Sequence, residues 1–329
     1  MTRPIYILGP CAAESREQVI TTAEQIRSRI SAFIYRAGVW KPRTSPKSFQ
    51  GAGEEGLKWL QEVKARLGVP VATEVATPEH VEAALQAGID YLWIGARTSA
   101  NPVTVSSLAS RIGDLRFKIG DLKGVLIKNP VNADAGLWLG NIERLEKTAV
   151  PVMAVHRGCN HQPCWSMAHA VRLARPDIPL LLDPSHMSGD AEQVPALMEK
   201  IPELGLDGAM IEVHNCPASA LSDAAQQIMP AALADLRLEI GDLRFTELNW
   251  LRAEIDELDE RLWDTIEARM DVSRRIGEWK KAHGVAPLQP ERYQQIVERL
   301  KARGERRGAT DFMLRIWDII HEQSIREQR

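Results

Sequence analysis

Eight short apolar runs alternate with amphipathic helical patterns across roughly the first 240 residues, and this repeat limits the fold more than any other feature. The runs are continuous rather than alternating, as expected for strands covered on both faces. Eight strand–helix repeats of this length predict an α/β fold, a closed parallel (β/α)8 TIM barrel. The predicted strands are Ile5–Leu8, Phe33–Trp40, Val69–Glu74, Tyr91–Gly95, Val125–Lys128, Val152–Val155, Leu180–Asp183 and Ala209–Val213.

The strand pattern stops near Thr246, where apolar residues begin to recur at spacings of three and four. This spacing predicts a long helix to about His283, followed by helices near 290–303 and 311–328. We therefore expect a barrel domain over residues 1–240 and an all-α helical domain over residues 241–329. The segment Leu233–Phe245 is interpreted as the last helix of the barrel and a short linker.

A formal charge of −3 and 26% charged residues give no basic excess of the kind that nucleic-acid binding requires. Charged residues, Gly or Pro interrupt every apolar segment, so we expect no membrane span and a cytoplasmic protein. The chain has only four cysteines, which predicts reduced thiols rather than a disulfide framework.

Active sites of this fold lie where the strands end, so the polar residues after each predicted strand are candidates for chemistry. Strands one, seven and eight are neighbours in a closed barrel, and each is followed by side chains that can bind a metal. A thiolate, an imidazole and two carboxylates suit manganese, iron, cobalt or zinc. The predicted ligands of this divalent metal are Cys11, His186, Glu212 and Asp223.

A second set of strand-end residues is cationic. Guanidinium groups match the oxygens of carboxylates and phosphates, so these residues predict a pocket for a small, multiply anionic substrate. The set consists of Arg36, Lys41, Arg97, Lys128 and Arg157, and the turn KPRTSP adds Arg43, Thr44 and Ser45. The pair Cys159 and Cys164 has no second pair at zinc-site spacing, and its role stays open.

The barrel region resembles the β subgroup of the type I 3-deoxy-D-arabino-heptulosonate 7-phosphate (DAHP) synthases. Seven motifs carry the resemblance, in the order GPCAAES, KPRTSP, IGARTSANP, IKNPVN, HRG, LLDPSH and IEVHNCP. The resemblance implies condensation of phosphoenolpyruvate with erythrose 4-phosphate, the entry step of the shikimate pathway of aromatic amino acid biosynthesis. It also implies the four metal ligands named above. The segment CNHQPCWSMAHA after HRG departs from the family's usual loop.

The resemblance further divides the cationic set. It implies that phosphoenolpyruvate is held by Arg36, Arg97, Lys128 and Arg157. Lys41, as a catalytic residue, and the KPRTSP residues Arg43, Thr44 and Ser45 would meet the reacting centre and the sugar phosphate. The related synthase that uses arabinose 5-phosphate stays open as an alternative.

In the helical region Arg269 interrupts an apolar stripe, seven residues after Leu262 and seven before Ile276, and an unpaired buried guanidinium is costly. Lys280 follows about 20° around the helix and roughly 16 Å along it, so both cations can close on one small anion. Arg252 lies about 25 Å before Arg269 on a different face and could reach the site of a partner subunit.

This arrangement resembles the all-helical chorismate mutases over residues 247–328, and it implies a homodimer through the helical domain. Arg269 and the partner's Arg252 would bind the two carboxylates of chorismate, with Arg292 nearby. Lys280 and Gln328 would donate to the ether oxygen, and Ser324 lies one turn before Gln328.

Two positions of the helical region depart from the mutase pattern. Gln289 and Tyr293 stand where the family commonly has acidic residues that contact the substrate hydroxyl, which leaves the mutase turnover open. The alternative function is an allosteric module that binds prephenate or chorismate and mediates dimerisation.

Overall fold

The computed structural model describes residues 4–41, 47–115, 122–236 and 247–328. The chain divides into two compact units, Met1–Glu254 and Ile255–Arg329. The predicted boundary at residues 240 and 241 lies outside the described residues. In the described part of the chain, no helix is long and apolar enough to cross a membrane.

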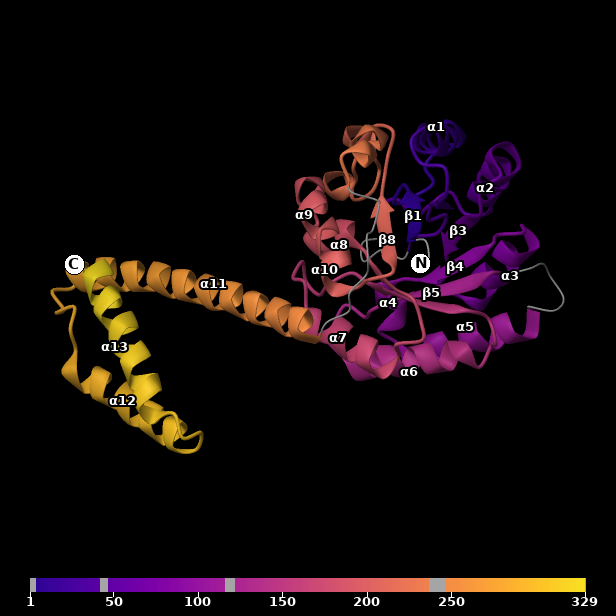
Figure 1. Cartoon of the computed structure of the whole chain (residues 1–329). Helices are drawn as coiled ribbons and strands as arrows, with labels where there is room; N and C mark the ends of the chain where they lie inside the picture. The colour runs from indigo at the N-terminus through magenta and orange to yellow at the C-terminus, as the bar shows by residue number, and fades with distance from the viewer. Residues whose placement is uncertain (1–3, 42–46, 116–121, 237–246, 329) are drawn as a thin grey trace. The chain divides into compact units, whose positions relative to one another are not determined.

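Strands β1 to β8 of the first unit form a closed parallel barrel surrounded by helices, which confirms the predicted fold (Figure 1). Each strand pairs with its neighbours in sequence, and β1 closes the ring by pairing with β8, for example Gly9 with Glu212. The strands are β1 (Ile5–Gly9), β2 (Ile34–Arg36), β3 (Val71–Glu74), β4 (Tyr91–Ile94), β5 (Gly124–Lys128), β6 (Val152–His156), β7 (Leu180–Leu182) and β8 (Gly208–Glu212).

Several helices of this unit begin at side chains that cap them. Ser15, Thr77 and Asp134 each accept a hydrogen bond from a backbone N–H of the first turn of their helix. The helices are α1 (Arg16–Arg27), α2 (Glu54–Leu67), α3 (Pro78–Gln86), α4 (Ala96–Ser99), α5 (Pro102–Leu115), α6 (Ala135–Glu146), α7 (Trp165–Ala174), α8 (Pro184–Ser188), α9 (Val194–Met198) and α10 (Lys200–Leu204).

Two apolar cores hold the barrel. The inner core is lined by strand residues such as Ile7, Trp93 and Met210, and the outer core lies between the strands and the helices. Both faces of each strand are therefore buried, which is why the strands read as continuous apolar runs.

Two predicted elements of the barrel differ from the structure. The second strand ends at Arg36 rather than Trp40, because Gly38 pairs with the loop after β1 and Lys41 N–H donates to the carbonyl of Gln50. The last barrel helix was expected at Leu233–Phe245, but its beginning is a short 3-10 helix, Pro230–Ala234, and residues 237–246 lie outside the described part.

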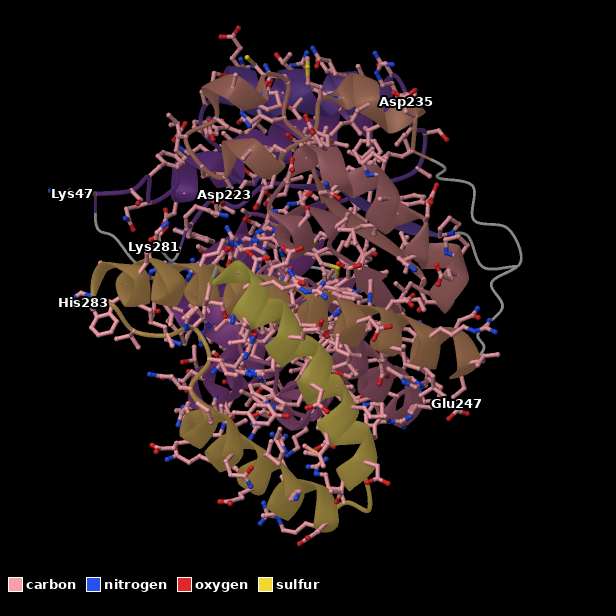
Figure 2. All side chains as sticks on the ribbon, turned by 90° about the vertical axis from the view of Figure 1, so that its left-hand side faces the viewer. Lys47, Asp223, Asp235, Glu247, Lys281 and His283 are labelled. Atoms are coloured by element: carbon pink, nitrogen blue, oxygen red, sulfur yellow. The ribbon has the colours of Figure 1, made fainter. Side chains whose placement is uncertain are left out.

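Helices α11 (Glu247–Ala282), α12 (Pro290–Glu305) and α13 (Thr310–Glu327) follow the predicted order. Figure 2 labels Glu247 at the beginning of α11 and Lys281 and His283 at its other end. The turn after α11 contains Gly284 with φ +66°, a conformation that favours glycine.

The first two turns of α11 belong to the barrel unit. Trp250 is fully buried, and its ring stacks on His169 and meets Trp165 edge-on, both in α7. His169 Nδ1 lies 2.7 Å from a carboxylate oxygen of Glu254. Residues 247–254 are thus part of the barrel's packing.

Candidate active site

Three of the four predicted metal ligands form one cluster at the carboxyl ends of β1 and β8. Ligand atoms of Cys11, Glu212 and Asp223 all lie within 4.8 Å of one another. The Cys11 thiol donates to Asp223 Oδ2 at 2.8 Å. Burial raises the pKa of Cys11 to about 12, and a cation bound here would lower it.

His186 lies beside this cluster and is oriented by Asp183. Its Nε2 is 3.6 Å from Glu212 Oε1, while its Nδ1 faces the Asp183 carboxylate at 2.9 Å. Burial alone would raise the pKa of Asp183, but the neighbouring His186 and Lys128 hold it well below its ordinary value. A carboxylate that accepts from Nδ1–H leaves Nε2 free as a ligand atom, which is the common arrangement of metal-binding histidines.

Buried guanidinium groups face the same region. Arg36 is 1% exposed, donates to Glu212 Oε1 at 3.0 Å and lies over the Trp93 ring. Among the described residues, Nε and Nη1 of Arg36 and Nε of Arg157 have no hydrogen-bond partner. Buried donors without partners are costly, so these edges favour an anionic ligand.

Lys41 is placed between the cluster and Glu74. Its Nζ lies 3.1 Å from Cys11 Sγ and 3.7 Å from Glu74 Oε2. A Cβ at Gly95, just after β4, would stand only 2.1 Å from Glu74 Oε1, so the glycine of IGAR makes room for this carboxylate.

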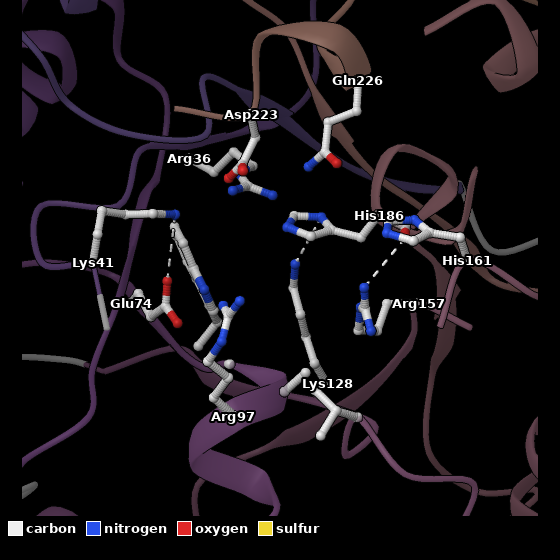
Figure 3. A pocket seen from close by; sticks show the side chains of 14 residues that line it. Arg36, Lys41, Glu74, Arg97, Lys128, Arg157, His161, His186, Asp223 and Gln226 are labelled. Atoms are coloured by element: carbon white, nitrogen blue, oxygen red, sulfur yellow. Dashed lines mark hydrogen bonds and ion pairs between the residues drawn. The ribbon is translucent and has the colours of Figure 1, made fainter. Parts of the chain in front are cut away.

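One cavity of about 220 Å³ is lined by the cationic side chains and by His186 and Asp223, as Figure 3 shows. Lys128 enters it from β5 and pairs with Asp183 at 2.5 Å, and Arg97 and Arg157 line its wall. Its polar lining consists of Arg36, Lys41, Glu74, Arg97, Lys128, Arg157, His161, His186, Asp223 and Gln226. The predicted Arg43, Thr44 and Ser45 lie outside the described residues.

Four residues of this site were not predicted from the sequence, and one of them, His161, lines the cavity from the loop after β6. Glu74 pairs with Lys41, Asp183 orients His186, and Gln226 donates to Glu212 Oε2 at 2.7 Å. Glu74 ends a predicted strand and Asp183 belongs to LLDPSH, so the strand-end rule applied to both. Gln226 carries no such signal.

In the helical unit the structure brings Arg269 to Ser324. The guanidinium donates to Ser324 Oγ and lies 4.9 Å from the ring centre of Trp317. Ser324 is 2% exposed and donates in turn to the carbonyl of Ile320 at 2.7 Å. Burial lowers the pKa of Arg269, as expected for a cation that is partly removed from water.

Lys280 and Gln328 also meet. Lys280 Nζ donates to Gln328 Oε1 at 2.9 Å and to the carbonyl of Pro287 at 2.6 Å. A Cβ at Gly277 would stand 2.6 Å from Gln328 Cα, so α11 and the end of α13 approach closely here.

Among the described residues, the other predicted residues of the helical region take no part in these two pairs. Arg252 is exposed and belongs to the barrel unit, and Arg292 is exposed in the first turn of α12, where it contacts Gln295. Gln289 precedes α12 without capping it, and the Tyr293 hydroxyl donates to Asp318 at 2.8 Å.

Comparison with known families identifies the barrel. The model of the DAHP synthetase I family matches residues 2–244. The chain belongs to this family. Its members are generally metal-dependent, in keeping with the donor cluster described above. The chorismate mutase type II model matches residues 251–329, so a DAHP synthetase I domain and a chorismate mutase domain are fused in one chain.

Curated and solved relatives agree with this assignment. A phospho-2-dehydro-3-deoxyheptonate aldolase of Thermotoga maritima is 31% identical over 232 residues, which are 68% of this chain and 64% of the relative. A crystal structure of the DAHP synthase of that organism superimposes with a TM-score of 0.62 at 30% identity, covering 71% of this chain and 67% of that one. A 2-dehydro-3-deoxyphosphooctonate aldolase of Bordetella petrii is 29% identical over 72% of this chain and 90% of its own length.

Proposed function

We propose that the barrel of this DAHP synthetase I protein condenses phosphoenolpyruvate with erythrose 4-phosphate, and that its helical domain rearranges chorismate to prephenate. The observation that carries the first activity is the set of buried, unpartnered guanidinium edges beside a cluster of metal-ligating side chains in one cavity. The direct test is an assay of DAHP formation by the purified chain with manganese present.

The donor set fits a divalent cation. Cys11, Glu212 and Asp223 offer one sulfur and two carboxylate oxygens within 4.8 Å, and His186 offers its Nε2 next to Glu212. Mixed sulfur, nitrogen and oxygen ligands suit manganese, iron, cobalt or zinc. When bound, such a cation supplies Lewis acidity to the aldehyde oxygen of the sugar phosphate.

The residues of the chain itself bind and orient the substrates. Arg36, Arg97, Lys128 and Arg157 would hold the carboxylate and phosphate of phosphoenolpyruvate, so that its C3 faces the aldehyde carbon. Lys41 Nζ, held between Cys11 and Glu74, would donate a proton to the oxygen on which charge develops. The phosphate leaves after water adds at C2, and the fixed cations stabilise its charge.

The identity of the sugar phosphate is a separate question, because both a phospho-2-dehydro-3-deoxyheptonate aldolase and a 2-dehydro-3-deoxyphosphooctonate aldolase match the barrel. We propose that the sugar phosphate is erythrose 4-phosphate, because of the KPRTSP motif and the fused mutase domain. We also propose that the barrel belongs to the β subgroup, because of the seven motifs of the barrel region. A competition assay with erythrose 4-phosphate and arabinose 5-phosphate tests this choice. Preferential use of arabinose 5-phosphate would reject it.

The mutase site is proposed at the meeting of α11 and α13. A pericyclic rearrangement needs no nucleophile, only a compact substrate conformer and donors at the oxygen whose bond breaks. Arg269 would bind a carboxylate, with Ser324 fixing its position, and Lys280 and Gln328 would donate to the ether oxygen. Loss of chorismate is the assay. A chain that binds prephenate but converts no chorismate would make the domain a sensor alone.

A homodimer completes this proposal. Large apolar side chains lie exposed along the helical unit although they recur at helical core spacing, and burying them against a second copy would be favourable. Those on α11 of this unit are Ile255, Leu258, Leu262, Trp263, Val272, Ile276 and Trp279. The second copy would also bring the partner's Arg252 to the mutase site.

The dimer is tested by sedimentation of the full chain and of the Leu262→Asp variant. We expect the variant to be monomeric and to lose mutase activity together with the dimer. A fully active monomer would reject the shared site. We propose a cytoplasmic location as well, since Cys11 must be a reduced thiol to serve as a ligand.

A further inference from the structure

A tight hairpin follows β6 at the edge of the synthase cavity. Cys159 and Gln162 pair as antiparallel neighbours and exchange two backbone hydrogen bonds of 2.9 Å each. The two corner residues, Asn160 and His161, both have left-handed backbone conformations, with φ of +50° and +59°. This geometry corresponds to a two-residue turn of type I′.

His161 stands where such a turn prefers glycine. Asn is well suited to the first corner, but a side chain at the second corner costs free energy that glycine would avoid. Strain of this kind is retained where the surrounding structure holds it in place, and it is concentrated at functional sites. A strained histidine at this position therefore indicates that its imidazole has a function.

The hairpin is fixed at its base by buried contacts. Asn129, fully buried after β5, donates to the carbonyl of Gly158 at 2.9 Å and accepts from the N–H of Arg157 at 2.7 Å. His156 Nε2 lies 2.6 Å from the carbonyl of Pro163 on the far side of the turn. The same contacts that position Arg157 therefore also position the corner that carries His161.

The imidazole faces the cavity and is given room there. His161 lines the same cavity as Arg157 and His186 (Figure 3). A Cβ at Gly189 would stand 2.7 Å from His161 Nδ1. The absence of a side chain at Gly189, just after α8, therefore leaves space for the imidazole ring. Within the described part of the chain, neither ring nitrogen has a hydrogen-bond partner.

We propose that His161 binds the phosphate group of phosphoenolpyruvate beside Arg157, as a specificity-determining residue that this chain adds to the synthase pocket. The inference rests on the proposed synthase function. An imidazole offers an N–H donor in its neutral and its charged form, and phosphate oxygens accept such donors. The exposed ring at the cavity edge is suited to a group that enters from solvent.

The test compares His161→Gly with Ala149→Gly. Ala149 is an exposed residue with φ +54° in the turn after α6, so its replacement relieves the same kind of strain away from the cavity. Both variants should keep the melting temperature of the wild type or raise it. Only His161→Gly should raise the KM for phosphoenolpyruvate, by about tenfold. It should raise the Kd of phosphoenolpyruvate, measured by calorimetry, by a similar factor. The KM for erythrose 4-phosphate should be unchanged.

The outcomes separate this inference from the proposed function. An unchanged KM for phosphoenolpyruvate in an active His161→Gly protein would overturn the role of His161 and leave the synthase assignment intact. A rise in the KM for erythrose 4-phosphate alone, or a lower melting temperature for His161→Gly only, would also overturn it. Absence of DAHP formation by the wild type would instead refute the proposed function.

Discussion

Cys11 is the proposed metal ligand whose loss should separate the two activities. Cys11→Ala removes the sulfur from the donor cluster, so DAHP formation should be abolished. Chorismate rearrangement should be nearly intact, because Arg269 and Lys280 belong to the other compact unit. Both rates are measured in the same preparation.

The matched control is Cys216→Ala, since Cys216 is an exposed free cysteine that does not belong to the donor cluster of Cys11, Glu212 and Asp223. It should leave both activities unchanged. Synthase activity that survives Cys11→Ala, or that resists chelators, would contradict the metal site.

His156 predicts how the stability of the barrel depends on pH. Burial lowers the pKa of this fully buried imidazole from the ordinary 6.5 to about 4. Between about pH 6.5 and about pH 4, His156 is therefore protonated in the unfolded chain but neutral in the folded barrel. Protonation then favours the unfolded state, so the free energy of unfolding decreases as the pH falls through this window. The full loss corresponds to roughly 3 kcal/mol.

His156→Gln keeps an N–H donor for the Pro163 carbonyl but does not titrate. Guanidinium titrations at about pH 7 and about pH 5 should show a smaller decrease in the unfolding free energy for the variant than for the wild type. An equal decrease in both proteins would mean that other groups cause the acid sensitivity.

The cavity residues show what the sequence could predict. Arg36, Lys128 and Arg157 line the cavity as predicted, because a side chain at the end of a barrel strand points toward the active-site end whatever its partners are. Glu74 and Asp183 were missed because their importance depends on Lys41 and Lys128, which come from other parts of the chain. Such pairings are fixed by the closed barrel and not by local pattern.

At the scale of elements, Gly277 limits how α11 and the end of α13 meet. An added Cβ would stand 2.6 Å from Gln328 Cα and 2.9 Å from its carbonyl oxygen, which are backbone atoms that cannot rotate away. Gly277→Ala should therefore destabilise the helical domain by about 1–3 kcal/mol and lower mutase activity, because Gln328 must shift away from Lys280.

Gly113→Ala provides the control, since Gly113 is a helical glycine in α5 and no other described residue lies within 4 Å of the added Cβ. It should stabilise the barrel by about 0.5–1 kcal/mol through helix propensity alone. Thermal unfolding followed by circular dichroism measures both effects. A Gly277→Ala protein as stable and active as the wild type would contradict the close approach.

The elements themselves were largely predictable, and the exceptions have tertiary causes. The barrel strands are buried on both faces and so carry a strong apolar signal. Leu248 and Leu251 recur at the apolar spacing that predicted α11, yet they are 54% and 45% exposed while Trp250 is fully buried. The rings of Trp165 and His169 in α7 determine which face of the helix is covered, and spacing within α11 cannot reveal them.

At the scale of the whole molecule, α11 links the two compact units in the chain. Its residues 247–254 belong to the barrel unit and its residues 255–282 to the helical unit. A ligand can shift activity only through different affinities for two arrangements, with couplings of about 1–3 kcal/mol. We hypothesise that the helical domain, besides catalysing, is the feedback sensor of the synthase.

The last prediction tests this coupling with prephenate. We expect prephenate to inhibit DAHP formation by the full chain and to have no effect on a chain that ends after Glu254. That end point keeps Trp250 and the contact of Glu254 with His169, which a shorter barrel would lose. Arg269→Ala in the full chain should also abolish the inhibition, since it removes the carboxylate-binding cation without removing the domain. Equal inhibition of the barrel alone would place the effect at the synthase site and refute the sensor role.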